Sequence, residues 1–113
     1  MNTLTDNKIK VAIKKAAGNS LPRQLMLHDV MFEHKKKLIA VRLRNNYTMI
    51  FPLTEFPLLL KASVAQREHW RLIAGGVGVH WPELDEDLSV KGFIQEHIRK
   101  SKSFIARNEL VVG

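Results

Sequence analysis

The residue types best suited to chemistry in this chain gather in residues 80–87, where a histidine precedes a compact group of acids. Four of these side chains could ligate a metal ion: His80, Glu83, Asp85 and Asp87. Calcium and magnesium accept carboxylate oxygens, but this segment lacks the central glycine and the distal glutamate of an EF-hand loop. Zinc would need a second well-placed histidine, and His69 and His97 are distant in the chain. We therefore predict no metal site.

The same segment could supply a general acid and a general base, His80 together with Asp85. No serine stands in a nucleophile elbow, and the absence of cysteine excludes a thiol nucleophile. The alternative is that His80 and Trp81 form a structural corner whose ring nitrogens bond to the backbone. We favour this corner and expect no catalytic residues, so the chain is not predicted to be an enzyme.

Glycines at positions 75, 76 and 78 could cradle a phosphate group. A dinucleotide fingerprint needs a strand before its glycines and a long helix directly after them. Here Pro82 follows instead, which disfavours such a helix. We predict a tight turn and no cofactor.

Tryptophan and arginine side chains define a candidate partner-binding surface, because both types are enriched among the residues that dominate protein interfaces. Tryptophan is also a frequent core residue, so each one must be exposed to serve this role. The candidate partner-binding residues are Arg67, Trp70, Arg71, His80 and Trp81.

The excess of positive charge lies in the first half of the chain. The net charge is +7; residues 1–50 hold ten Lys or Arg against three acids, and residues 51–113 hold eight of each. A basic half fits either a solvated surface or a face that meets phosphate. The candidate nucleic-acid contacts are Lys8, Lys14, Lys15, Lys35, Lys36, Lys37, Arg42 and Arg44. Tyr47 alone among aromatic residues is nearby, which disfavours stacking on single strands.

Hydrophobic periodicity indicates which elements position these residues. Apolar residues spaced three and four apart predict a basic amphipathic helix over 6–17. Alternation then predicts strands over 25–32, 39–44 and 47–51, with Met26, His28, Val30 and Phe32 on one face of the first strand. A two-residue turn is expected at Asn45–Asn46, because asparagine tolerates positive φ. These strands form a three-stranded antiparallel meander.

Short elements follow the meander. Thr54 is expected to cap one helix, and Ser63 with Gln66 forms a capping box for another. Residues 70–73 and 79–81 are predicted to be extended. The acids before Ser89 favour the positive end of a last helix, which Ser89 caps and which ends at residues 101–103. The inner face of that helix comprises Val90, Phe93, Ile94 and Ile98.

The predicted fold is α+β: the meander, short helices, a further glycine-rich strand segment and a C-terminal helix. We divide the chain into a basic helical extension (1–21), a compact α+β domain (22–99) and a C-terminal tail (100–113). The longest apolar run, Leu58–Leu60, is too short to span a bilayer, so a soluble cytoplasmic protein is expected.

The order of several uncommon blocks carries a family resemblance. These blocks are Phe51-Pro52-Leu53, Phe56-Pro57-Leu58-Leu59, Trp70-Arg71-Leu72-Ile73 and the run from Gly78 to Val90. Over about residues 25–94 the chain resembles domain-of-unknown-function family 2442, small bacterial proteins suspected to be antitoxin-like. The family often shows a further glycine where this chain has Ala74. The resemblance implies a compact α+β fold and a protein partner encoded by an adjacent gene.

The function that we expect is a small non-catalytic binding module that acts through a partner protein, and the resemblance implies an antitoxin-like role. The alternative is a protein that binds the phosphate backbone of nucleic acid or regulates transcription, and a metal-dependent enzyme ranks third. No membrane partner is expected. A homodimer stays open, because apolar residues of the tail could pair with a second copy.

Overall fold

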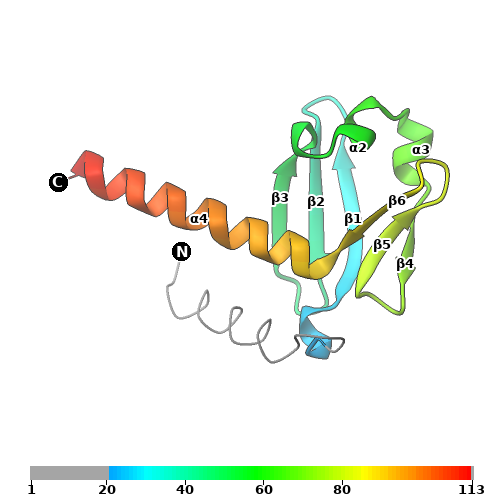
Figure 1. Ribbon diagram of the computed structural model, residues 1–113, viewed down its shortest axis with the longest axis horizontal. Coiled ribbons are helices and arrows are strands. Elements are labelled where there is room, and N and C mark those ends of the chain that lie inside the picture. The colour runs from blue at the N-terminus through cyan, green and yellow to red at the C-terminus, as the bar shows by residue number, and fades with distance from the viewer. Residues whose placement is uncertain (1–20, 113) are drawn as a thin grey trace.

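The computed structural model describes residues 21–112, with side chains as far as Ser101. The predicted helix over 6–17, and with it Lys8, Lys14 and Lys15, lies outside the described residues. Figure 1 shows two small sheets side by side, with the long C-terminal helix starting beside one sheet, crossing in front of the other and extending past its edge. Within the described residues no helix combines the length and apolarity needed to cross a bilayer.

The elements follow one another without long loops. In chain order they are η1 (Arg23–Leu25), β1 (Leu27–Glu33), β2 (Leu38–Leu43), β3 (Thr48–Pro52), η2 (Leu53–Glu55), α2 (Pro57–Lys61), α3 (Val64–Glu68), β4 (Arg71–Ile73), β5 (Gly78–Trp81), β6 (Glu86–Ser89) and α4 (Val90–Val112). The α+β fold is therefore confirmed.

Strands β1, β2 and β3 form the predicted antiparallel meander, which we call sheet A. Its second turn holds three residues rather than two, because the backbone N–H of Leu43 bonds to the carbonyl of Tyr47 and that of Asn46 bonds to the carbonyl of Leu43. Asn46 takes the left-handed conformation (φ 70°) that this turn requires. The prediction of asparagine at positive φ was correct, and the turn is one residue longer than predicted.

A β-bulge changes which side chains of β1 face the core. Leu27 pairs with Leu43 and Asp29 pairs with Arg42, so one residue of β1, His28, has no partner on β2. The extra residue shifts the alternation, and Leu27 and Val30 are both buried while His28 is exposed. The prediction that His28 and Val30 lie on one face of the strand was wrong for this reason.

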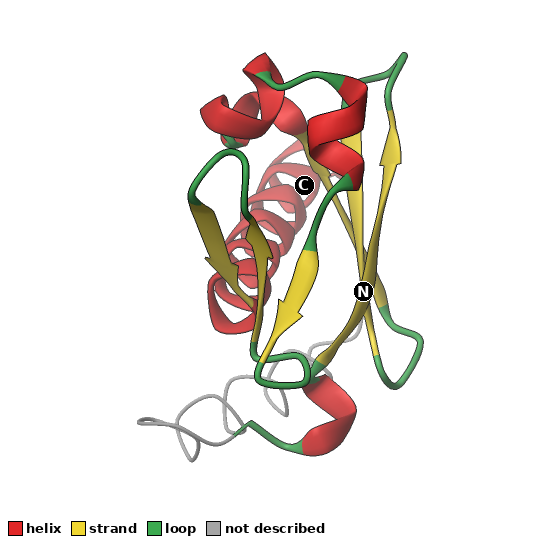
Figure 2. Ribbon diagram, turned by 90° about the vertical axis from the view of Figure 1, so that its right-hand side faces the viewer, coloured by secondary structure: helices red, strands yellow, loops and turns green. Residues whose placement is uncertain are grey.

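The short helices cover one end of the strands, with η1 at the other end (Figure 2). The prediction that Thr54 caps a helix was wrong, because Thr54 lies inside η2 and α2 begins at Pro57 with no side-chain cap. The capping box of α3 is confirmed, because the Ser63 side chain accepts from the Gln66 backbone N–H (3.1 Å) and the Gln66 side chain accepts from the Ser63 backbone N–H (3.0 Å).

A second antiparallel sheet, sheet B, has the order β4-β5-β6. The predicted extended segments correspond to β4 and β5, but β6 was missed, because its acids were interpreted as a polar approach to the last helix. The turn between β4 and β5 holds Ala74 (φ 45°), Gly75 (φ 74°) and Gly76 (φ 131°). The Gly76 carbonyl accepts from the Leu27 backbone N–H at 2.7 Å, which joins this turn of sheet B to the start of sheet A.

Helix α4 buries the predicted face between the two sheets: Val90, Phe93, Ile94 and Ile98. It does not end at residues 101–103 but continues to Val112, and in Figure 1 its later turns extend beyond sheet A. The prediction that the helix ends at residues 101–103 was therefore wrong. The division of the chain at residues 22–99 stays a prediction.

Candidate binding groove

One groove opens where η2, β6 and the first turns of α4 meet, and its volume is about 590 Å³. We call it the α4–β6 groove, defined by the residues that line it: Glu55, Phe56, Asp87, Leu88, Ser89, Gly92, Phe93 and Glu96. Figure 1 shows the elements concerned, with α2 near one end of the strands and β6 leading into α4.

The floor of the groove is apolar and aromatic. Phe56 and Phe93 meet edge to face with ring centroids 5.8 Å apart, and each also contacts the buried Phe51 at 5.9 and 5.6 Å. Pro57 occupies the first position of α2, where its fixed φ angle suits the start of a helix, and Phe56 directly precedes it. The rings are therefore held by the core.

Glu55 brings a carboxylate to the rim. Its Oε1 accepts from Lys100 Nζ at 2.5 Å, which ties η2 to α4. Its Oε2 is buried and has no hydrogen-bond partner among the described residues. A buried acceptor without a donor costs free energy, so this oxygen is the atom of the groove with most to gain from a bound donor.

Glu96 lines the same groove as Glu55. A hydrogen bond from Arg99 lowers the pKa of Glu96 below its usual range, against a smaller rise from burial, and the positive charges of Arg99 and Lys100 lower it further. Each of the two acids is thus paired with a cation of α4, Glu55 with Lys100 and Glu96 with Arg99.

The third acid, Asp87, pairs with His80. Strand register places them opposite one another on β5 and β6, and His80 Nδ1 meets Asp87 Oδ1. Asp85, the acid that the sequence offered beside His80 for acid–base chemistry, instead takes a left-handed conformation (φ 49°) in the turn before β6. Sequence reasoning missed β6 and hence this cross-strand pairing.

Ser89 and Gly92 form the wall at the start of α4. The Gly92 backbone N–H donates to Ser89 Oγ at 3.0 Å, which confirms Ser89 as the helix cap. Gly92 has no side chain to occupy the groove, and a Cβ placed there would meet the nearest atom, Ser89 Oγ, at 3.1 Å.

The predicted partner-binding residues divide into two groups. Trp81 and Arg67 are buried, with 0% and 6% of their surface exposed, and so offer no surface to a partner in this fold. Arg71 is exposed, while Trp70 and His80 are half-buried. An interface role for Trp70, Arg71 and His80 stays a prediction.

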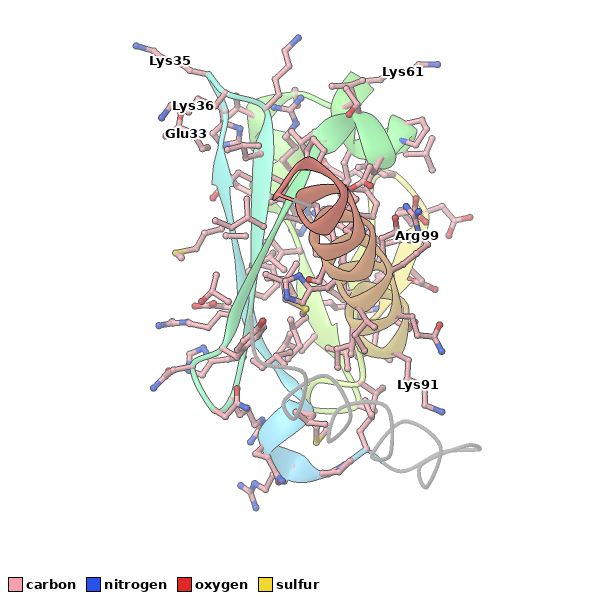
Figure 3. All side chains as sticks on the ribbon, turned by 90° about the vertical axis from the view of Figure 1, so that its left-hand side faces the viewer. Glu33, Lys35, Lys36, Lys61, Lys91 and Arg99 are labelled. Carbon is pink, nitrogen blue, oxygen red and sulfur yellow. The ribbon has the colours of Figure 1, made fainter. Side chains whose placement is uncertain are left out.

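The predicted nucleic-acid contacts are also divided. Lys35, Lys36 and Lys37 are exposed at the β1–β2 turn, where Figure 3 shows Lys35 and Lys36 pointing away from the protein. Arg42 is held by Asp29 through bonds of 2.6 and 3.1 Å. Arg44 donates to the Gly75 carbonyl at 2.6 Å, so the two arginines do not form one free cationic row with the lysines.

Among the described residues no group of three or more His, Cys, Asp or Glu side chains is placed to hold a metal ion. The groove residues Glu55, Phe56 and Glu96 were not singled out from the sequence. They come from parts of the chain that the packing of α4 brings together, and only Phe56 belongs to one of the sequence blocks noted above.

The comparisons with known proteins agree with the fold. The family model described as "Protein of unknown function (DUF2442)" matches residues 29–98. A crystal structure of a protein of unknown function from Rhodospirillum rubrum is 27% identical with a TM-score of 0.55, covering 65% of this chain and 88% of that chain. A solution NMR structure of an uncharacterized protein from Chromobacterium violaceum is 20% identical with a TM-score of 0.55, covering 96% of this chain and 93% of that chain, which supports the fold alone. No curated protein matches the chain.

Proposed function

The chain belongs to the DUF2442 family of proteins of unknown function, and from this premise we propose that it is a small cytoplasmic, non-catalytic binding module that holds a segment of a partner protein in the α4–β6 groove. The resemblance noted from the sequence favours the product of an adjacent gene as the partner, in the manner of an antitoxin.

The observation that carries this proposal is the groove itself. Its volume of about 590 Å³ lies within the range of about 300–1,000 Å³ typical of ligand sites. It combines an aromatic floor with a few polar groups, which is the composition that such sites share. A protruding apolar side chain of a partner would bury its surface on Phe56 and Phe93 and would displace water from them.

Two features favour binding over catalysis. Ser89 Oγ, the hydroxyl that lines the groove, already accepts the backbone N–H of Gly92 and so serves as a helix cap. His80, which contacts the groove residue Asp87, faces the carboxylate of that residue on the neighbouring strand. Neither arrangement joins a base to a nucleophile, which is the pairing that covalent catalysis needs.

Site-specific photocrosslinking tests the proposal. A diazirine amino acid close to leucine in size, placed at Leu88, should crosslink one protein in lysate of the source cells, and peptide mapping should place the crosslink on a single segment of it. The matched control carries the same amino acid at Thr48, an exposed residue of β3 on the outer face of sheet A. Equal crosslinking from both positions, or none from Leu88, would reject the groove as the binding site.

A second candidate, contact with a phosphate backbone, is supported by one observation. Residues 21–52, which form η1 and sheet A, hold six Lys or Arg against two acids, whereas residues 53–101 hold six against seven. The described part of the chain therefore carries its positive excess around sheet A, with exposed lysines at the β1–β2 turn. Its test is the salt dependence argued in the Discussion.

A further inference from the structure

We infer that the partner segment lies in the α4–β6 groove as an extended strand that adds to the free edge of β6, with an apolar side chain on the groove floor and a basic side chain beside Glu86. This inference rests on the proposed function and states how the same groove recognises its partner, through the main chain of the segment as well as its side chains.

The strand that borders the groove is an edge strand of sheet B. The order of the described strands is β4-β5-β6, so one side of β6 pairs with β5 and the other side has no strand beside it. Figure 2 shows β6 as the outermost strand of this sheet. Asp87, Leu88 and Ser89 belong to β6 and also line the groove, so the groove runs along the free edge. Such an edge is a template for a strand from another chain.

The register of β6 against β5 identifies the backbone groups that face the groove. The backbone N–H of Val90 donates to the carbonyl of Val77 at 3.0 Å, one residue beyond the last pair of the two strands. Hydrogen-bonded and non-hydrogen-bonded pairs alternate along an antiparallel ladder. Leu88 therefore directs its backbone groups to β5, whereas Asp87 and Ser89 direct theirs to the free edge.

Three of these outward groups can bond to an added strand. The carbonyl of Ser89 serves the first turn of α4, as the carbonyl of a helix cap does, but its N–H faces the edge. The Asp87 carbonyl faces the edge as well. The Asp87 N–H donates to Oε1 of the adjacent Glu86 at 3.1 Å, in an exposed bond that a partner carbonyl can replace. An extended segment would satisfy all three groups at once.

The side chains around the edge leave room for a main chain. His80 holds the Asp87 side chain toward β5, away from the edge. Gly92, beside Ser89, has no side chain, and among the described residues a Cβ there would come within 4 Å of Ser89 Oγ alone, at 3.1 Å. The fold itself therefore does not require glycine at this position, although glycine is among the least favourable residues in a helix. Its bare backbone instead lets an added strand approach the start of α4 closely.

The side chains of β6 indicate what the segment carries. Alternate side chains of an added strand face the groove. The one opposite Leu88 would lie on the floor with Phe56 and Phe93, which favours an apolar residue. The one opposite Glu86, two positions along the segment, would meet a carboxylate. Glu86 and the preceding Asp85 take part in none of the ion pairs of the described residues, so a lysine or arginine is favoured there.

The same charges disfavour a second copy of this chain as the occupant. Pairing β6 with β6 of a second copy would bring Asp85, Glu86 and Asp87 of both chains into one short interface. Like charges that face each other across strands are destabilising. Charge complementarity therefore selects a basic segment of a different protein.

A synthetic peptide tests the inference: acetyl-Thr-Lys-Thr-Leu-Thr-Lys-Thr-amide, which offers the leucine and a flanking lysine in either strand direction. It is titrated into the full-length, ¹⁵N-labelled protein. We expect the amide signals of Asp87 and Ser89 to shift with a dissociation constant of about 1 mM. The exchange of these two amide protons with solvent should also slow, because both become hydrogen-bonded. The amide of Leu88, which faces β5, is the internal control.

Backbone methylation tests whether the main chain is recognised. One derivative carries an N-methyl group on the leucine and another carries it on the threonine that follows. Successive N–H groups of a strand point to opposite edges, so only one of the two methyl groups would face β6. That derivative should bind at least about tenfold more weakly than the other, through the lost hydrogen bond and the added bulk. Equal binding of the two derivatives, at any level, would overturn the inference.

A charge reversal tests the basic side chain. The peptide with glutamate in place of both lysines should bind at least about tenfold more weakly than the lysine peptide. Glu86→Gln should weaken binding of the lysine peptide by about threefold, as for an exposed ion pair, because the amide keeps the shape and loses the charge. Glu83→Gln, which removes an acid from the turn outside the groove, should leave this affinity unchanged. Equal affinity for the two peptides would show that the segment is not selected by charge and would overturn its basic character.

The outcomes separate this inference from the proposed function. If the lysine peptide shifts neither Asp87 nor Ser89, the added strand is overturned, while the crosslink from Leu88 still tests the groove as a partner site. Absence of that crosslink would remove the proposed function and this inference with it. If the full-length chain sediments as a dimer that the peptide dissociates, the edge is occupied by a second copy and the segment of a different protein is overturned.

Discussion

The indole Nε1–H of Trp81 donates to the main-chain carbonyl of Arg67 at 2.9 Å, and both side chains are buried. This bond joins β5 to α3 and lies in the core. The corner predicted for Trp81, with its ring nitrogen bonded to the backbone, is thereby confirmed for the indole. The pairing also explains why the tryptophan and arginine signal, which sequence reasoning assigned in part to a partner surface, stabilises the interior instead.

The first prediction concerns the guanidinium of Arg67. Its Nε and Nη2 each donate at 2.8 Å, to the carbonyls of Leu59 and Leu60 at the end of α2, and Nη1 donates to His34 at 3.3 Å. Arg67→Ala should lower the free energy of unfolding by roughly 2–4 kcal/mol, because the carbonyls lose their donors and a buried volume is emptied. Urea denaturation followed by tryptophan fluorescence measures this change.

Arg71→Ala is the matched control, because Arg71 is exposed at the start of β4. It should change the free energy of unfolding by no more than about 0.5 kcal/mol. Equal effects of the two substitutions would contradict a structural role for the Arg67 bonds.

The second prediction concerns pH and the Asp29–Arg42 pair. The hydrogen bond from Arg42 lowers the pKa of Asp29 below its ordinary value of 3.8, against a smaller opposing effect of burial. A carboxyl whose pKa is lower in the folded state adds stability above its unfolded pKa, and this stability is lost as the pH falls through the folded pKa. The protein should therefore lose part of its stability to acid at this pair below pH 3.8.

Asp29→Asn isolates this contribution. The variant should be less stable than the parent at neutral pH, and the difference between the two should shrink as the pH is lowered below 3.8. Urea midpoints of both proteins across this range provide the measurement. A difference that stays constant with pH would show that the charge of Asp29 is not the cause.

The sequence predicts those parts of the structure whose pattern of residues lies within one short segment of the chain. Alternating apolar residues identify the buried face of β2, which comprises Ile39, Val41 and Leu43. Apolar residues spaced three and four apart identify the buried face of α4, which includes Val90, Phe93 and Ile94. The meander and the inner side of α4 were therefore predicted correctly. The capping box at Ser63 was equally local. In each case the residues that carry the signal are the residues that form the element.

The features that were missed depend on contacts between distant segments. The bulge at His28 is set by the pairing of β1 with β2, and no residue type at that position marks it. Strand β6 carries acids that are poor strand formers, and pairing with β5 overrides their preference. The groove joins Glu55 to Glu96 through the packing of α4, so its chemistry could not be read from either segment alone.

The third prediction concerns Ala74, which has φ of 45°. A left-handed conformation costs a residue with a side chain about 1–2 kcal/mol, and glycine avoids this cost at a smaller entropic penalty. Ala74→Gly should therefore raise the free energy of unfolding by about 0.5–1 kcal/mol. The effect is read from urea denaturation.

Gly76→Ala tests the same turn in the opposite sense. A Cβ at Gly76 would lie 2.6 Å from the Leu27 carbonyl oxygen, which is backbone and cannot yield easily. This substitution should be destabilising by more than about 2 kcal/mol, through the clash and the positive φ together. A mild effect would argue against the close approach of the two sheets at this turn.

The fourth prediction tests the phosphate-backbone candidate. Replacing Lys35, Lys36 and Lys37 together by glutamine should reduce the salt dependence of duplex DNA binding, the slope of log K against log salt, by roughly two to three units, because each phosphate that a lysine no longer neutralises lowers the slope by about 0.9. Fluorescence anisotropy at several salt concentrations measures the slope. If the parent protein does not bind duplex DNA at low salt, this candidate function is removed.

The last prediction separates stability from binding at Gly92. Glycine inside a helix is less favourable than alanine by about 1 kcal/mol, and the Gly92 Cβ position meets only the movable hydroxyl of Ser89 at 3.1 Å. Gly92→Ala and Gly92→Leu should therefore both keep or raise the free energy of unfolding, by up to about 1 kcal/mol.

The leucine side chain would extend into the groove, whereas the alanine methyl would leave most of it open. Gly92→Leu should abolish the crosslink from Leu88, and Gly92→Ala should retain it. Retention of the crosslink in a folded Gly92→Leu variant would place the partner outside the groove.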